Sequence, residues 1–126
     1  MGLASTTYAS VSKTLLYLHT IHPTTVLSTF KLEFPTTHAA ILSSFREHVR
    51  SLPRPQPSEK NPEPKVVAVI DGIISLPGVL LPWKEMVQIC KEAGIITVVD
   101  AAHSIGQEVG LDLGKVQPDF WVSVRY

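Results

Sequence analysis

The stretch from Ile95 to Gln107 constrains the fold of this chain more than any other. It begins with an almost continuous β-branched run, Ile95 to Val99, which is typical of a strand that is buried on both faces of a sheet. The run ends in Asp100, and His103 follows three residues later. Because ligands of parallel α/β sheets bind beyond the carboxyl ends of the strands, this acid and this histidine indicate a candidate site.

Composition limits the class of protein. The 126 residues are enough for one domain with a modest core, and 44% apolar and 17% charged content indicate a folded chain. The net charge of zero argues against nucleic acid as a partner, and no apolar run is long enough to span a membrane. Cys90 is the single cysteine, so the sequence excludes an internal disulfide and predicts a reducing compartment such as the cytoplasm.

A second buried strand is predicted from Val66 to Ile70, and it also ends in an acid, Asp71. Apolar residues at helical spacing follow between Trp83 and Ala93, and Gly94 is suited to end that helix. Together with the strand that ends in Asp100, these segments predict a strand–helix–strand unit with parallel strands. The predicted fold class is therefore α/β, a mostly parallel sheet with flanking helices.

Two helices and an edge strand are predicted before this unit. Residues 5–7 are good N-caps for a first helix that ends near residues 19–22, before Pro23. Its predicted apolar face contains Tyr8, Val11, Leu15 and Leu18. Phe30, Leu32 and Phe34 alternate with charged residues, which is typical of a strand near a sheet edge. Thr36 or Thr37 is predicted to cap a second helix with an apolar face of Ile41, Phe45, His48, Val49 and Leu52.

Two further segments stand apart from this pattern. Residues 53–65 hold five of the ten prolines among polar residues, which predicts a solvated linker or insertion before the next strand. The last strand-like run, Phe120 to Val124, has no helix after it, so we expect exposed apolar surface there and a missing part of the sheet domain.

Several kinds of site remain open for Asp100 and His103 on their spacing alone. Two ligands are too few for a metal site, and a hydrolase would need a nucleophile, although no Gly-x-Ser-x-Gly motif occurs. Asp71 and Asp100 together would also suit a phosphoacceptor or Mg²⁺ pocket. In the structural alternative, Asp100 caps the next turn and His103 is an ordinary loop histidine. Cys90 lies on the predicted buried helix face, where a thiol is usually inert.

Four motifs resemble class V aminotransferases, which are pyridoxal-phosphate enzymes of fold type I. The motifs are Ser75-Leu76-Pro77-Gly78 with Pro82-Trp83, then Val99 to Gly106, Asp112 to Lys115, and Pro118 to Ser123. The sequence is most similar to the fungal subgroup related to isopenicillin N epimerases, cysteine desulfurases and hercynylcysteine sulfoxide lyases. Tyr8 and Lys13-Thr14-Leu15 resemble the preceding helix of that family more loosely.

The resemblance implies a role for three residues in cofactor binding. Asp100 matches the family's aspartate, which pairs with the pyridine nitrogen of the cofactor and keeps it protonated. His103 and Ser75 match positions beside the phenolic oxygen, where a donor tunes the cofactor. The resemblance further implies a homodimer and an amino-acid substrate for the full-length form, used in transamination, epimerisation or carbon–sulfur bond cleavage.

The sequence departs from the family where the cofactor lysine is expected. In the family a His-Lys pair follows the Pro-Asp-Phe strand, whereas here Ser123 is followed by Val124-Arg125-Tyr126. We therefore expect residues 1–126 to be a fragment of the large domain that contains no catalytic residue, does not bind the cofactor covalently and is inactive. The alternatives are a non-catalytic remnant or interaction module, or a small stand-alone α/β binding domain.

Overall fold

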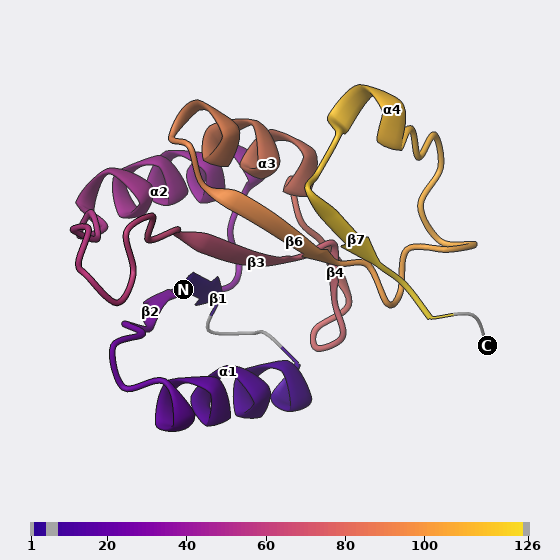
Figure 1. Cartoon of the computed structure of the whole chain (residues 1–126). Coiled ribbons are helices and arrows are strands. Elements are labelled where there is room, and N and C mark those ends of the chain that lie inside the picture. The colour runs from indigo at the N-terminus through magenta and orange to yellow at the C-terminus, as the bar shows by residue number, and fades with distance from the viewer. Residues whose placement is uncertain (1, 5–7, 125–126) are drawn as a thin grey trace.

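The central element of the structure, a computed structural model that describes residues 2–4 and 8–124, is a five-stranded parallel sheet (Figure 1). The strands lie in the order β2-β1-β3-β6-β7, and every neighbouring pair is parallel. The strands are β1 (Gly2–Ala4), β2 (Ser28–Phe30), β3 (Val67–Asp71), β6 (Ile96–Asp100) and β7 (Phe120–Val122). The predicted α/β fold class is therefore confirmed.

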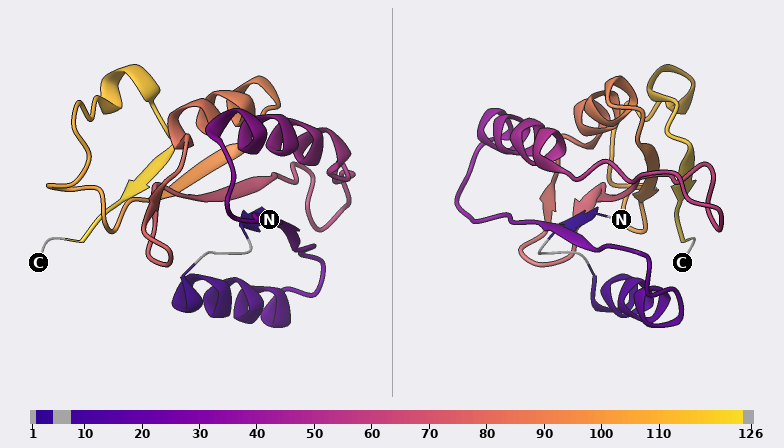
Figure 2. Two further views of the ribbon diagram at one scale, coloured as in Figure 1. Left: turned by 180° about the vertical axis from the view of Figure 1, so that it is seen from behind. Right: turned by 60° about the vertical axis from the view of Figure 1, so that its left-hand side comes forward.

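Helices lie on both sides of this sheet (Figures 1 and 2). α2 (His38–Ser51) and α3 (Trp83–Glu92) lie on one face, and α1 (Ala9–Ile21) lies on the other. A short helix, α4 (Leu113–Val116), precedes β7, and β4 (Ile73–Ile74) forms a small antiparallel hairpin with β5 (Val79–Leu80). No helix in the described part of the chain has the length and apolar character needed to cross a bilayer.

The predicted strand–helix–strand unit is β3, α3 and β6, and its strands are parallel as expected. The register brings Asp71 opposite Asp100, so both acids lie at one edge of the sheet. Gly94 follows α3 with a φ of +67°, the left-handed conformation that glycine adopts readily after a helix. The core lies between this unit and α2, and it includes Phe45, Ile70, Trp83, Met86, Val87 and Val99.

Burial of β6 differs from the prediction. Thr97 and Val99 are fully buried, but Ile96 and Val98 on the other face are half-buried. α1 on that side contributes a single buried side chain, Leu15, so it covers the second face loosely. The β-branched run is therefore buried on one face of the sheet and partly open on the other.

The first helix begins later than predicted. Residues 5–7 lie outside the described part of the chain, and Tyr8 is the N-cap of α1, without a capping hydrogen bond from its side chain. Tyr8 is exposed, whereas Val11 and Leu18 are half-buried. Tyr8 therefore does not belong to the predicted apolar face. The predicted end is confirmed, since α1 ends at Ile21.

The second helix and the edge strand agree with their patterns. The Thr37 hydroxyl caps α2 by accepting a hydrogen bond from the Ala40 backbone N–H at 3.2 Å. β2 lies at one edge of the sheet, but it ends at Phe30, so Leu32 and Phe34 lie beyond the strand although burial still alternates through Phe30 and Leu32. Residues 53–65 form a mostly exposed connection from α2 to β3, and its description as an insertion stays a prediction.

β7 at the other edge exposes apolar side chains. Phe120, Val122 and Val124 are 59%, 56% and 45% exposed. They alternate with the half-buried Trp121 and Ser123, so they project from one face of the strand. The predicted exposure of this strand is confirmed.

Candidate functional site

A cleft of ≈370 Å³ opens where β3 and β6 end. It is lined by Tyr8, Asp71, Ile73, Ser75, Asp100, Ala102, His103 and Val124. Its place at the carboxyl edge of the sheet is the one expected for ligands of parallel α/β sheets. Its volume lies within the range of small-molecule sites. All three residues that the sequence predicted for a site, Ser75, Asp100 and His103, therefore meet in one cleft.

Asp100 is positioned by the end of its strand. It is the last residue of β6, and its Oδ1 accepts a hydrogen bond of 3.1 Å from the Ala102 backbone N–H. This contact is the turn cap of the structural alternative, and it turns the chain towards His103. Among the described residues, the second carboxylate oxygen has no hydrogen-bond partner. Capping thus occupies one oxygen, and the other can bind a ligand.

His103 and Ser75 reach the cleft from two different loops. His103 lies in the turn after β6 and is half-buried, whereas Ser75 follows β4 and is exposed. Neither the His103 ring nor the Ser75 hydroxyl has a hydrogen-bond partner within the described residues. Both groups are therefore available to donate to or accept from a ligand in the cleft.

Asp71 is a second carboxylate in the cleft wall, and it is only 4% exposed. Its position beside Asp100 is the pairing that suggested a phosphoacceptor or Mg²⁺ pocket. Within residues 2–4 and 8–124, no three His, Cys, Asp or Glu side chains are grouped as they would be around a metal ion.

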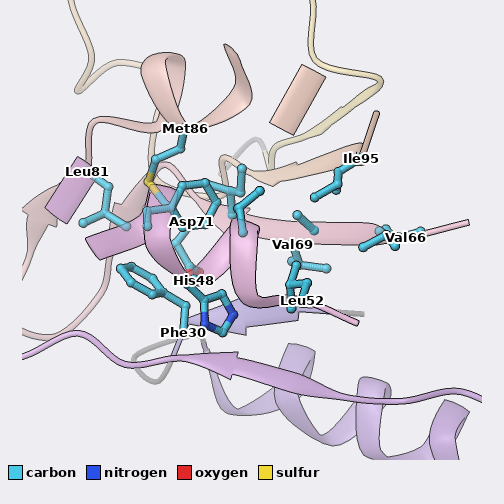
Figure 3. A pocket seen from close by; sticks show the side chains of 14 residues that line it. Phe30, His48, Leu52, Val66, Val69, Asp71, Leu81, Met86 and Ile95 are labelled. Atoms are coloured by element: carbon cyan, nitrogen blue, oxygen red, sulfur yellow. The ribbon is translucent and has the colours of Figure 1, made fainter. Parts of the chain in front are cut away.

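Asp71 also borders a separate apolar cavity beneath α2 (Figure 3). This cavity measures ≈20 Å³, which is enough for one water molecule but not for a cofactor. Phe30 and His48 lie side by side in its wall, with ring centres 5.5 Å apart. Burial lowers the pKa of His48, so this imidazole favours its neutral form. We interpret the cavity as a packing gap of the core.

Tyr8 lines the cleft although the sequence did not indicate it as a site residue. Its helical spacing with Val11 and Leu15 predicted a place on the apolar face of α1. As the N-cap it instead has non-helical backbone, with φ −51° and ψ 137°, and it lines the cleft. An aromatic ring at the edge of a cleft offers a face on which a flat ligand can pack.

The Pro-Asp-Phe motif has a structural role next to the site. The Asp119 carboxylate accepts hydrogen bonds from the backbone N–H and the hydroxyl of Thr97, at 2.8 and 2.9 Å. The Thr97 hydroxyl in turn accepts from the Asp119 backbone N–H at 3.0 Å. These hydrogen bonds, chiefly the one from the Thr97 backbone, lower the pKa of Asp119. Asp119 therefore joins β7 to β6 and does not line the cleft.

Cys90 also lies outside the cleft. It is fully buried on α3, and burial, with a smaller contribution from the charge of Asp119, raises the pKa of its thiol to about 12. A thiol with this pKa is almost entirely protonated at neutral pH, which makes it a poor nucleophile. The structure thus agrees with the predicted inert thiol.

Solved structures with the same arrangement of strands and helices are enzymes of fold type I. The serine palmitoyltransferase of Sphingomonas wittichii superposes with a TM-score of 0.64 at 22% identity, over 97% of this chain and 27% of that one. Serine palmitoyltransferase with pyridoxal phosphate also matches, with a TM-score of 0.55 at 24% identity, over 82% of this chain and 21% of that one. At these identities the likeness establishes the fold, which is that of pyridoxal-phosphate-dependent enzymes.

Sequence relatives identify the family within that fold. The aminotransferase class-V family matches residues 37–124. An L-cysteine desulfhydrase-like protein of Epichloe uncinata is 33% identical over 94% of this chain and 24% of its own length. The L-cysteine desulfhydrase of Arabidopsis thaliana is 39% identical over 74% of this chain and 19% of its own length.

The chain belongs to the aminotransferase class-V family, and it spans about a quarter or less of the relatives that it matches. Pyridoxal phosphate is the cofactor of this family. The resemblance stated from the sequence is thereby confirmed. The cofactor roles of Ser75, Asp100 and His103 stay predictions.

Proposed function

We propose that this chain forms the ring-binding part of a pyridoxal-phosphate site in an enzyme that acts on an amino acid. The observation that carries this proposal is the meeting of Ser75, Asp100 and His103 around one cleft, each with a polar group that no described residue occupies. The donor set fits the cofactor, because a carboxylate suits a pyridine nitrogen and the other two groups suit a phenolic oxygen.

Each residue has a distinct task in this proposal. The free oxygen of Asp100 holds a proton at the pyridine nitrogen, where a charge-assisted hydrogen bond keeps the ring electron-poor. His103 and Ser75 bind the phenolic oxygen from the two loops, and Tyr8 excludes water from one side of the ring. When bound, pyridoxal phosphate supplies an electron sink for the carbanion at the Cα of an amino acid.

A covalent bond to the cofactor is not part of the proposal for this chain. None of the described residues that line the cleft is a lysine, and the arginine at position 125 keeps its proton and so cannot act as the amine. We propose that the chain as given binds the cofactor without a covalent bond and does not turn over substrate. The longer form would act in the cytoplasm as a homodimer.

The relatives favour one of the three reaction types. Both relatives described above are named for cysteine desulfhydration, which is a carbon–sulfur bond cleavage. We therefore propose a sulfur-containing amino acid as the substrate class of the longer form. Transamination and epimerisation remain the alternatives within the family.

The decisive experiment is a binding titration of pyridoxal phosphate against the purified chain, followed by its absorbance and by equilibrium dialysis. We expect reversible binding that Asp100→Ala weakens about tenfold or more, since a hydrogen bond to a charged group contributes about 1.5–3 kcal/mol. Glu59→Ala, in the exposed connection, is the matched control. Wild-type affinity in Asp100→Ala, or a borohydride-stable adduct at a lysine, would contradict the proposal.

A second candidate function is an interaction module. The exposed Phe120 and Val122 of β7 and Val124 just after it favour it, because apolar side chains at an edge strand are a common docking surface. A chain that binds no pyridoxal phosphate but associates through β7 would support this alternative.

A further inference from the structure

Glu108 is a nearly buried carboxylate outside the cleft. Its side chain is 3% exposed, and its two oxygens accept hydrogen bonds from the indole N–H of Trp83 at 3.1 and 3.2 Å. The Lys84 ammonium lies 2.9 Å from Oε1. Burial of a carboxylate is costly unless it is paired in this way, so these contacts fix the position of Glu108 firmly.

The partners of Glu108 belong to the first turn of α3, whereas Glu108 itself lies in the loop between β6 and α4 that also carries His103. Trp83 is 1% exposed, so it is a rigid support for that loop. The backbone N–H of Glu108 donates to the Ser104 carbonyl at 2.9 Å, and Ser104 follows His103 directly. The Glu108 carboxylate therefore connects α3 to the turn that presents the imidazole to the cleft.

The position of the turn at Ser104 depends on the residues packed around it. The Ser104 side chain is fully buried, and its hydroxyl has no hydrogen-bond partner within the described residues. A Cβ atom added at Gly72 would lie 3.0 Å from that hydroxyl and 3.7 Å from the Trp83 ring. The turn is thus packed between Gly72 and Trp83, and within the described residues the Ser104 hydroxyl adds no hydrogen bond that would hold it there.

We propose that Glu108 is a positioning residue for His103. The carboxylate holds the loop against Trp83, and the loop holds the imidazole at the cleft. The part of this inference that concerns the cofactor rests on the proposed function. Without Glu108, the loop would keep its backbone bonds but lose its attachment to α3, so His103 would sample several positions.

The test compares Glu108→Ala with Glu108→Gln in the full chain. The glutamine carbonyl can still accept from the Trp83 indole, so Glu108→Gln should behave like the wild type. The first readout is the ¹H–¹³C spectrum of the His103 ring, assigned with His103→Asn. The second is the affinity for pyridoxal phosphate. Glu85→Ala, on the exposed side of the same helical turn, is the control.

We expect Glu108→Ala to move the His103 resonance towards its position in urea, while the His48 resonance stays unchanged. The affinity for pyridoxal phosphate should fall about tenfold, which is the lower end of what loss of a supporting residue costs at metal sites. If Glu108→Ala does not fold, Trp83→Phe removes the indole hydrogen bonds while the Lys84 ion pair remains, and it should displace the His103 resonance in the same direction.

Two results would overturn the inference. One is an unchanged His103 resonance in the folded Glu108→Ala and Trp83→Phe variants. The other is a Glu108→Gln variant whose His103 resonance moves towards its position in urea as far as that of Glu108→Ala does. A wild-type chain that binds no pyridoxal phosphate would refute the proposed function, and the His103 spectra would then decide the positioning role by themselves.

Discussion

At the scale of single residues, burial decides which polar groups can react. Cys90 lies on α3, and His103 lies in the loop after β6. The thiol is fully buried, whereas the imidazole is half-exposed at the cleft. Burial raises the pKa of Cys90, whereas the Ser75 hydroxyl beside His103 is exposed. The chain therefore keeps its strongest potential nucleophile away from its candidate site.

We expect Cys90 to resist modification in the folded chain. A pKa raised from 9.0 to about 12 lowers the thiolate fraction at pH 8.5 by about three orders of magnitude. The rate of reaction with a chromogenic disulfide should be lower by at least that factor than in the unfolded chain. The same raised pKa favours the protonated folded state, so this contribution to stability should be lost between about pH 9 and 12.

The control for this experiment is the same chain in guanidinium chloride, where the thiol is accessible and has its ordinary pKa. Native and unfolded reaction rates that agree within a few-fold would show that Cys90 is not buried as described.

The sequence predicted the position of a site residue where neighbouring residues in the chain determine that position. Asp100 and His103 follow a strand directly, so their place at the sheet edge could be inferred. Tyr8 was missed because its spacing fits the apolar face of the helix, although α1 begins one residue later, at Ala9. Glu108 was missed because its partner Trp83 lies 25 residues away and no local pattern links the two.

At the scale of elements, one aspartate adds side-chain hydrogen bonds to the pairing of β6 with β7. Asp119 receives two hydrogen bonds from Thr97 just before β7 begins. β7 pairs with β6 over three residues only, and these contacts supplement that short ladder. The aspartate of the Pro-Asp-Phe motif is thus explained by sheet assembly.

We expect Asp119→Asn to destabilise the chain by about 1 kcal/mol at pH 7, a modest value because the carboxylate is exposed and screened by solvent. The pKa of Asp119 is lowered in the folded state, so its contribution is complete above the unfolded-state value of 3.8. It is lost as the pH falls through the folded-state pKa. Urea unfolding at several pH values measures this difference in the free energy of unfolding.

The free energies of unfolding of the wild type and of Asp119→Asn should become equal at low pH. Glu59→Gln, which changes an exposed carboxylate in the connection, should show no such difference at any pH. A gap between wild type and Asp119→Asn that persists in strong acid would contradict the electrostatic explanation.

Elements with strong periodicity were predicted well, and short ones were not. The apolar pattern is consistent over several turns in α2 and α3 and over five residues in β3 and β6. The three-residue β1, the hairpin of β4 with β5 and the one-turn α4 lie in segments for which the sequence pattern predicted no helix or strand. Such elements depend on neighbours in space, for instance β1 on β2 and β3, which a local pattern does not contain.

At the scale of the whole molecule, the sheet is covered unevenly. α2 and α3 pack tightly on one face, whereas α1 on the other contributes one buried side chain. The exposed residues of β7 extend the open apolar surface to the sheet edge. The order of strands and this uneven cover are properties of the assembled sheet, so the sequence predicted the exposure of β7 but not the strand order.

We expect this open surface to cause self-association. Replacing Phe120 and Val122 by lysine should lower the weight-average sedimentation coefficient to that of a monomer, since charged residues on an edge strand oppose pairing with another chain. Sedimentation velocity at increasing protein concentration measures this change.

The matched control replaces Leu76 and Val109, two exposed loop residues, by lysine, which adds the same charge away from β7. Equal dissociation in both double variants would mean that net charge, and not the β7 surface, controls association.

The proline-rich connection over residues 53–65 is a suitable attachment site for a label or a solid support. It enters β3 at the amino end of that strand, so the whole length of the strand separates it from the cleft. A fluorophore, biotin or resin linker attached at an exposed position such as Gln56 would leave the cleft facing the bulk solution. The chain can therefore be immobilised there and its ligands exchanged repeatedly, without an anchor close to the residues that would bind them.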